Sequence, residues 1–285
     1  PDASLLNEAD KWILSRVNRL AKDVTENMDK FELGIAVQKV YDFIWDEFCD
    51  WYVETAKYRI YHKEEEKAAA DCVLWVLKTV LKQALKLLHP FMPFITEEIY
   101  SVLVPEEESL MMSEWPQFHA EWDFPAEENV MEHVKEITRG IRNMRAEMNV
   151  PNNRKTKVYV VCVDTEICDG ISTLENSIKP LMMAEKILVQ QTKENIADNA
   201  VSVVVPDAVV YLPLEDLVDF EQEMERLQKE EEKLKKEIKR AEGMLSNERF
   251  ISKAPEAKVQ EEREKLEKYT QMLQQVQERM AGLKK

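Results

Sequence analysis

The chain has 285 residues, of which 45% are hydrophobic, and it carries a formal net charge of −16 at pH 7. This composition allows one large domain or two smaller ones, whereas only five glycines argue against Gly-rich phosphate loops and a turn-dense all-β fold. No apolar run approaches the roughly 18 residues that span a bilayer. The first residues show neither an initiator Met nor a signal-peptide pattern, so we expect an excised piece of a cytoplasmic protein without membrane contact.

Residues 1–150 are predicted to form a first domain, an antiparallel helical bundle. Three segments carry apolar residues at helical spacing. Their stripes are Ile13, Val17, Leu20 and Val24; Val37, Tyr41, Ile44, Phe48 and Tyr52; and Val73, Leu77, Val80, Ala84 and Leu87. In the second segment Trp45 and Trp51 are expected to widen the buried face.

The end of this bundle is marked by prolines. Pro90 and Pro93 are predicted to terminate the third helix, and Thr96 is positioned to cap a short helix that runs to Leu103. Residues 105–126 have little periodicity and are expected to form a loop over the bundle. A further helix is predicted at 127–148.

At Pro151 the pattern changes to short β-branched runs. These runs lie at 158–163, 186–190, 201–205 and 209–212, with a helical stretch near 171–183. The pattern predicts a small α/β module, residues 151–215.

Residues 216–285 are predicted to form a coiled-coil arm. Apolar positions alternate at 3-4 spacing from Leu217 to Leu245 and again from Val259 to Leu283, with a break around Pro255. Two such helices joined by a short loop make an antiparallel coiled-coil hairpin. Because the arm can pair with itself, we expect a monomer, with pairing between chains as the alternative. The predicted fold class is therefore mainly α.

The cysteines and histidines do not form a recognisable metal-binding pattern. Four of each are spread along the chain without CxxC or HxxxH spacing. The cysteines Cys49, Cys72, Cys162 and Cys168 are expected to be reduced and packed as small hydrophobic groups. We predict no metal site and no cofactor in this chain.

Negative charge is distributed unevenly. Residues 1–150 carry 17 Lys and Arg against 29 Asp and Glu, whereas residues 216–285 carry 16 against 17. An acidic total is therefore compatible with local basic stripes, and the whole-chain charge does not exclude a nucleic-acid partner.

Several segments of the bundle resemble one enzyme family. In chain order they are Asp46–Glu54 with Lys57, Leu88–Glu98, Ser113–Pro116 and Ile141–Glu147. They resemble the class I aminoacyl-tRNA synthetases for valine, isoleucine and leucine; the first two are long and specific, whereas the last two are weak alone.

The C-terminal arm distinguishes among these three synthetases. Its segments Val218–Asp219, Arg226–Glu230 and Asn247–Pro255 resemble the coiled-coil arm of valyl-tRNA synthetases. Isoleucyl enzymes more often end in a cysteine-ligated zinc module, which this sequence lacks. The resemblance covers nearly the whole chain and is least distinctive at 155–212.

The resemblance implies a function in tRNA binding. In the family the bundle receives the anticodon stem-loop, the arm contacts the outer corner of the tRNA, and the full enzyme attaches valine to tRNA(Val) with ATP and Mg. The ATP-binding signatures His-Ile-Gly-His and Lys-Met-Ser-Lys-Ser do not occur here, and nothing resembles the editing domain. We therefore expect this chain to be inactive alone and to serve an N-terminal catalytic domain of the same polypeptide.

Trp12, Arg16 and Arg19 are the candidate anticodon contacts on the first helix, because they share one flank of its apolar stripe. An indole beside two guanidinium groups suits unstacked bases and phosphates. The alternative is a core tryptophan bordered by arginines that pair with Asp23 or Glu26.

A basic stripe is predicted on the helix at 127–148. Its candidate tRNA-binding residues are Lys135, Arg139, Arg142 and Arg145, followed by Arg154 and Lys155. Such a stripe suits a phosphate backbone. The alternatives are pairing with Glu132, Glu136 and Glu147, or docking on the catalytic domain.

A third group of candidate residues lies on the arm. These residues are Lys233, Lys235, Lys236, Lys239, Arg240, Arg249, Lys253 and Lys258. A projecting basic arm can contact the tRNA elbow by shape without reading bases. The alternative is a solvated helix surface whose lysines pair with neighbouring glutamates. For the chain as a whole, the rival interpretation is a protein-interaction scaffold.

Overall fold

The computed structural model describes residues 2–217, 220–247, 251–252 and 254–283, and it divides into two compact units. The first unit is Pro1–Leu217 and the second is Val218–Lys285. The predicted boundary at 215/216 lies two residues from this division, whereas the predicted boundary at 150/151 falls inside the first unit. Among the described residues, no helix is long and apolar enough to cross a membrane.

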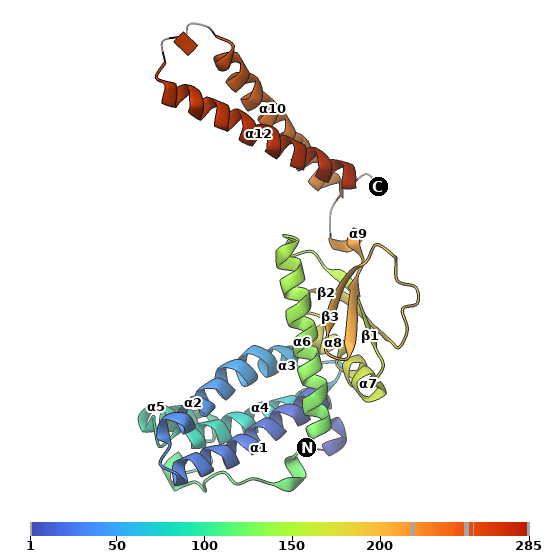
Figure 1. Cartoon of the computed structure of the whole chain (residues 1–285). Helices are drawn as coiled ribbons and strands as arrows, with labels where there is room; N and C mark the ends of the chain where they lie inside the picture. The colour runs from blue at the N-terminus through green and yellow to red at the C-terminus, as the bar shows by residue number, and fades with distance from the viewer. Residues whose placement is uncertain (1, 218–219, 248–250, 253, 284–285) are drawn as a thin grey trace. The chain divides into compact units, whose positions relative to one another are not determined.

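A helical bundle forms the N-terminal part of the first unit (Figure 1). After a short 3-10 turn, η1 (Ala3–Leu5), its helices are α1 (Glu8–Asp29), α2 (Leu33–Asp42), η2 (Phe43–Val53), α3 (Glu54–Tyr61), α4 (Lys67–Leu88) and α5 (Pro93–Leu103). Helix α1 begins with a capping box in which the side chains of Asn7 and Asp10 bond each other's backbone N–H. The stripe predicted on α1 is fully buried, as expected for an amphipathic helix.

The second predicted helix is interrupted by a π-helical segment, η2. Because a π turn holds more residues than an α turn, the buried positions shift from Val40 and Phe43 to Phe48 and Tyr52. The prediction that Trp45 widens the buried face is wrong, since 53% of its surface is exposed; Trp51, at 8%, is buried as predicted.

A buried ion pair joins α1 to α3. The carboxylate of Asp10 accepts hydrogen bonds from Arg59 Nη2 (2.5 Å) and Tyr52 Oη (2.7 Å). Burial raises the pKa of Tyr52 well above its ordinary value. A buried charge of this kind is tolerated because it is paired and hydrogen-bonded.

The short helix α5 begins three residues before the predicted cap. Pro93 occupies its first turn, where a proline needs no hydrogen-bond donor. Thr96 lies inside the helix instead of capping it: its hydroxyl donates to the Met92 carbonyl at 2.8 Å and lies 2.8 Å from His89 Nδ1. The predicted loop follows, with the short 3-10 turns η3 (Leu110–Met112) and η4 (Ala120–Trp122).

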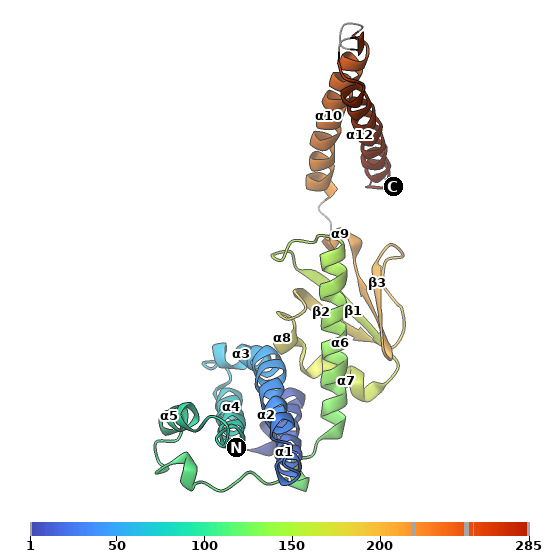
Figure 2. The same cartoon turned by 60° about the vertical axis from the view of Figure 1, so that its left-hand side comes forward.

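Helix α6 (Pro125–Glu147) links the bundle to a four-stranded sheet (Figure 2). The sheet and its helices are β1 (Thr156–Cys162), α7 (Thr165–Thr173), α8 (Glu175–Ile178), β2 (Ala184–Gln190), β3 (Val201–Val205) and β4 (Ala208–Leu212), followed by α9 (Leu214–Leu217). The strand order is β2-β1-β4-β3, with β1 and β2 parallel and the other pairs antiparallel. The predicted α/β module is confirmed, but its helical part, predicted near 171–183, lies at 165–178 in two pieces.

Two glycines allow the close contacts of α6. A Cβ on Gly140 would lie 2.6 Å from Val203 of β3, and a Cβ on Gly170 of α7 would lie 2.7 Å from Val130. Both distances are too short for a larger residue without movement of its neighbour. Helix α6 therefore belongs to the bundle and to the sheet at once, which explains why 1–217 is one compact unit.

The prediction of four reduced cysteines is wrong for Cys162 and Cys168, which form a disulfide. Cys162 ends β1 and Cys168 lies in α7, so the turn between them brings their Cα atoms to 6.4 Å, within the range that a disulfide spans. Cys49 and Cys72 are free thiols.

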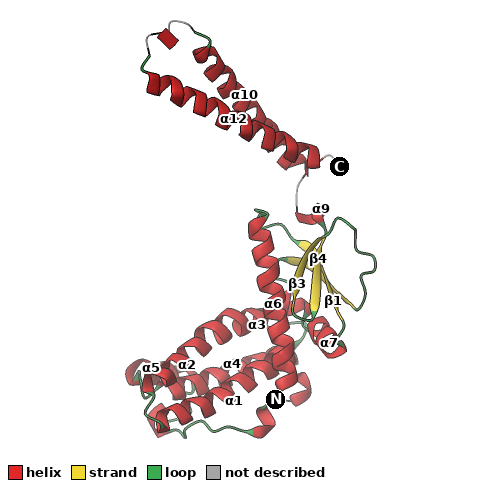
Figure 3. Ribbon diagram, in the orientation of Figure 1, coloured by secondary structure: helices red, strands yellow, loops and turns green. Residues whose placement is uncertain are grey.

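The second unit is a helical hairpin, the arm, formed by α10 (Phe220–Leu245) and α12 (Glu256–Leu283) (Figure 3). Its seam contains Leu227 and Leu234 of α10 and Val276 of α12, with Tyr269 and Met280 packed against them. The coiled-coil hairpin predicted from the 3-4 spacing is confirmed.

Candidate nucleic-acid interface

A groove of about 570 Å³ lies between η2 and α6, and we call it the η2–α6 groove. Its lining residues are Asp46, Glu47, Asp50 and Trp51 of η2 with Lys135, Arg139 and Arg142 of α6. One wall is therefore acidic and the other basic.

The basic wall is built around the indole of Trp51. The guanidinium carbons of Arg139 and Arg142 each lie 5.9 Å from the centre of its ring. Arg139 also pairs with Glu136 at 2.8 Å, and Arg142 donates from Nε to the Leu181 carbonyl at 3.2 Å. Both arginines remain exposed, so this wall presents two cations that an anionic ligand can reach.

Two other members of the predicted stripe are buried. Lys135 is 6% exposed; its ammonium pairs with Glu132 at 2.7 Å and lies 4.5 Å from the ring centre of Trp12. Arg145 is 3% exposed and donates to the carbonyls of Pro151 and Arg154. Burial lowers the pKa of Arg145. Both charges are paired or hydrogen-bonded within the protein, although all four stripe residues share one helix.

Of the two basic residues predicted after α6, one is held by hydrogen bonds and the other is exposed. Arg154 donates from Nε to the Asp216 carbonyl at 2.6 Å, which ties the start of β1 to α9. Lys155 is exposed to solvent. Of the predicted stripe, the exposed residues are therefore Arg139, Arg142 and Lys155.

Trp12 does not offer a stacking face for a base. Its side chain is 0% exposed, and its Nε1 is buried without a hydrogen-bond partner among the described residues. This burial matches the alternative of a core tryptophan and does not fit the stacking hypothesis.

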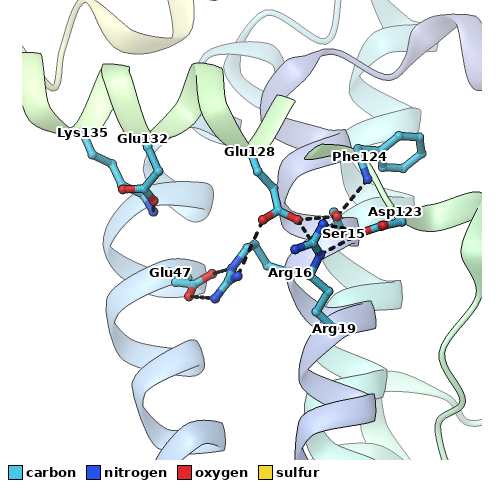
Figure 4. A network of polar contacts seen from close by, with 9 residues as sticks. All are labelled: Ser15, Arg16, Arg19, Glu47, Asp123, Phe124, Glu128, Glu132 and Lys135. Carbon is cyan, nitrogen blue, oxygen red and sulfur yellow. Dashed lines mark hydrogen bonds and ion pairs between the residues drawn. The ribbon is translucent and has the colours of Figure 1, made fainter. Parts of the chain in front are cut away.

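Arg16 and Arg19 belong to an ion-pair network that ties α1 to η2 and α6 (Figure 4). Arg16 donates to both oxygens of Glu47, at 2.7 and 2.8 Å, and lies 3.7 Å from Glu128. Arg19 pairs with Asp123 at 2.7 Å and with Glu128 at 3.1 Å. The hydrogen bond to Glu47 raises the pKa of Arg16. These partners differ from Asp23 and Glu26, which the sequence suggested.

The same network fixes the start of α6. Ser15 donates its hydroxyl proton to Glu128 at 2.5 Å and accepts the backbone N–H of Phe124 at 2.9 Å (Figure 4). Glu128 thus lies in the first turn of α6, where a carboxylate is favoured by the helix dipole. The network holds Arg16 and Arg19 within the bundle, and 37% and 39% of their side-chain surfaces are exposed; their contact with tRNA stays a prediction.

The arm carries a cluster of exposed lysines on α10. Lys233, Lys236 and Lys239 form no ion pair with any residue that the structure describes, whereas Lys235 pairs with Glu231 at 2.7 Å and Arg240 lies 3.9 Å from Glu237. The side chains of Lys233, Lys236 and Lys239 point away from the Leu227–Leu234 seam.

At the tip of the arm, Lys258 is exposed, and Arg249 and Lys253 lie outside the described residues. The basic surface of α10 is therefore partly neutralised and partly available to a polyanion.

Sequence reasoning missed the η2–α6 groove because its acidic wall depends on the π turn. Asp46 and Asp50 are separated by one helical turn, and Arg139 and Arg142 likewise, but neither pair indicates that the two walls face each other. The described residues contain no cluster of His, Cys, Asp or Glu that could hold a metal ion.

Comparison with known families gives two matches that together cover most of the chain. Residues 10–160 match the anticodon-binding domain of tRNA ligase, and residues 219–284 match the valyl tRNA synthetase tRNA binding arm. The α/β module between them lies largely outside both matches.

Relatives of similar sequence are valine–tRNA ligases. The chain is 50% identical to a valine–tRNA ligase of Clostridium perfringens over 275 residues, which is 96% of this chain and 31% of that protein. Valine–tRNA ligases of Clostridium tetani and Bacillus subtilis are 48% and 39% identical over 99% and 97% of the chain, and over 32% and 31% of their own lengths. The chain thus spans about a third of the length of these relatives.

Proposed function

Because the chain belongs to the family of tRNA-ligase anticodon-binding domains and carries a valyl-tRNA synthetase tRNA-binding arm, we propose that it holds valine-accepting tRNA for a valine–tRNA ligase. The bundle would receive the anticodon stem-loop and the arm would contact the elbow. Binding energy collected far from the reacting ends would serve to orient the acceptor end at a distant active site.

The exposed pair Arg139 and Arg142 carries the proposal for the bundle. Two guanidinium groups beside the Trp51 ring suit a phosphate backbone that follows the basic wall of the η2–α6 groove. Asp46 and Asp50 on the opposite wall would repel phosphates and accept N–H groups of bases. Lys155 is a further exposed cation after α6, whereas Arg16, Arg19, Lys135 and Arg145 would act by holding the bundle together.

On the arm, Lys233, Lys236 and Lys239 would contact phosphates of the tRNA elbow. These lysines form no ion pair with a described residue, and lysines that meet phosphates release counterions, so binding should weaken steeply with salt. We expect weaker phosphate contacts from the other exposed basic residues of the arm, Lys235, Arg240 and Lys258.

The full ligase would use ATP, Mg and valine in the cytoplasm through a catalytic domain of the same polypeptide. Used alone, the 285-residue chain should not exchange pyrophosphate into ATP in a valine-dependent reaction. Valine-dependent exchange by the purified chain would contradict this assignment.

Filter binding at several salt concentrations, combined with gel filtration, tests the proposal. A tRNA-binding chain should be a monomer that binds a valine tRNA transcript in a salt-sensitive manner. An oligomer without salt-sensitive RNA affinity would instead indicate a protein-interaction scaffold.

A further inference from the structure

The sheet of the α/β module has one covered and one open face. Helices α6 and α7 lie against one face (Figures 1 and 2), where Val158, Val160 and Val210 are fully buried. The side chains of alternate residues point to the opposite face, because the side-chain period of a strand is two. Apart from the short helix α9, which contacts β1, no helix in the described part of the first unit lies against that opposite face, which we call the outer face.

The outer face presents two rows of side chains across the strands. The strand register places Leu188, Tyr159, Tyr211 and Ser202 in one row, and Gln190, Val161, Val209 and Val204 in the next. Tyr159 and Tyr211 are directly opposite each other on β1 and β4, and both are only partly buried. Val204 is 77% exposed. The result is a flat, largely apolar surface with two aromatic rings at its centre.

Positive charge accompanies this surface. Lys157 and Lys186 are paired in the β1–β2 register on the outer face, and Lys193 lies with Nζ 5.1 Å from the ring centre of Tyr211. The strand positions that form the two rows contain no acidic residue. Lys157, Lys186 and Lys193 are exposed, so a polyanion can reach them, although Asp216 lies beside Lys157 and accepts its backbone N–H at 3.1 Å.

Flat aromatic surfaces bordered by lysines suit unpaired nucleotides. Every base has a planar face that can stack on an aromatic ring, and the connecting phosphates can approach neighbouring ammonium groups. A four-stranded sheet with aromatic residues on its open face is one of the recurring ways in which proteins bind unstacked RNA bases. The two rows carry no charge of either sign, and the exposed lysines beside them favour a phosphate-bearing ligand over a protein partner.

We propose that the outer face binds unpaired nucleotides of the tRNA, with bases stacked on Tyr159 and Tyr211 and phosphates near Lys157, Lys186 and Lys193. This inference rests on the proposed tRNA-binding function, and it assigns a role to the module that lies largely outside both family matches.

Ring-removing and ring-keeping variants of the whole 285-residue chain test the proposal. Tyr159→Leu and Tyr211→Leu remove the stacking surface but retain an apolar side chain, and each should weaken binding of a valine tRNA transcript roughly tenfold. Tyr159→Phe and Tyr211→Phe keep the ring and should bind as the unchanged chain does. Circular dichroism melts of each variant verify that the module remains folded.

Photocrosslinking of the unchanged chain gives a second readout that requires no variant. A transcript that contains 4-thiouridine should crosslink to peptides of β1 or β4, and a fully paired RNA duplex should not. Wild-type affinity in both leucine variants, together with absence of β1 and β4 crosslinks, would overturn the proposal and favour a protein partner for the outer face. If the unchanged chain showed no tRNA binding at all, the proposed function would fail together with this inference.

Discussion

Arg16 and Glu47 are joined by two parallel hydrogen bonds, from Nε to Oε2 at 2.7 Å and from Nη2 to Oε1 at 2.8 Å. Arg16 lies on α1 and Glu47 on the π-helical segment η2, so the pair fixes the helix that carries the acidic wall of the η2–α6 groove. A paired guanidinium with two oriented bonds is a specific connection between these elements.

This pair should contribute to stability more than to RNA affinity. Arg16→Ala and Glu47→Ala, alone and combined, form a double-mutant cycle for which we expect a coupling energy of about 1–2 kcal/mol, because both groups are partly exposed. Urea unfolding measures the coupling energy. A coupling energy near zero, accompanied by a large loss of tRNA affinity in Arg16→Ala, would indicate that Arg16 contacts the tRNA directly.

The main elements were predictable because each depends on local periodicity. The 3-4 spacing of the arm and the stripe of α1 determine which side chains are buried, and the structure agrees with both. The module was predictable from its β-branched runs, although its strand order was not, because residues distant in sequence decide the pairing.

The candidate site was predictable only in part. Lys135 and Arg145 share a helix with Arg139 and Arg142, yet contacts with Trp12 and with the loop after α6 bury the first two. A helical wheel cannot show this, because its polar face says nothing about which other elements lie against it. The buried face of α2 and η2 runs through Ala36, Val40 and Phe43, so Tyr41 and Trp45 of the predicted stripe are exposed instead.

Reversing the charge of Arg139 and Arg142 tests the basic wall. Arg139→Glu and Arg142→Glu should weaken tRNA binding, and the slope of log affinity against log salt should fall by about one for each phosphate contact removed. Lys63→Glu is a matched control, because Lys63 is exposed in the turn after α3 and no ion pair involves it in the described chain. Equal losses in the control and in the arginine variants would indicate a general charge effect.

Neutralising the α10 lysines that form no ion pair with the described residues tests the arm. The triple variant Lys233→Gln, Lys236→Gln, Lys239→Gln should lower the salt slope by about two to three while the hairpin stays folded, because these side chains face away from its seam. Lys265→Gln removes a lysine that already pairs with Glu261 and Glu262, and its slope should stay unchanged. An unaltered slope in the triple variant would exclude these lysines as phosphate contacts.

Glu97 should give the loop after α5 a pH-dependent stability. Its carboxylate accepts the backbone N–H of Leu110 at 2.9 Å, the Ser109 hydroxyl at 3.1 Å and the N–H of Met111 at 3.3 Å, and these bonds, the one from Leu110 foremost, lower its pKa below the ordinary 4.5. Because the folded-state pKa is lower than in the unfolded chain, the stabilisation is present above the ordinary pKa and is lost as the pH falls through the folded-state pKa.

Thermal melts of Glu97→Gln at neutral pH and at about pH 3 measure this contribution. The variant should melt below the unchanged chain at neutral pH, and the difference should shrink in acid. Glu98→Gln, a substitution in the adjacent exposed residue, should show no such difference. A gap of equal size at both pH values would mean that the charge of Glu97 does not matter.

Competition between valine-accepting and isoleucine-accepting tRNA transcripts for the 285-residue chain measures whether it prefers valine-accepting tRNA. The valine transcript should displace the isoleucine transcript at lower concentration, and raised salt should weaken both complexes. Equal displacement by the two transcripts, or no displacement by either, would contradict the claim that this chain holds valine-accepting tRNA.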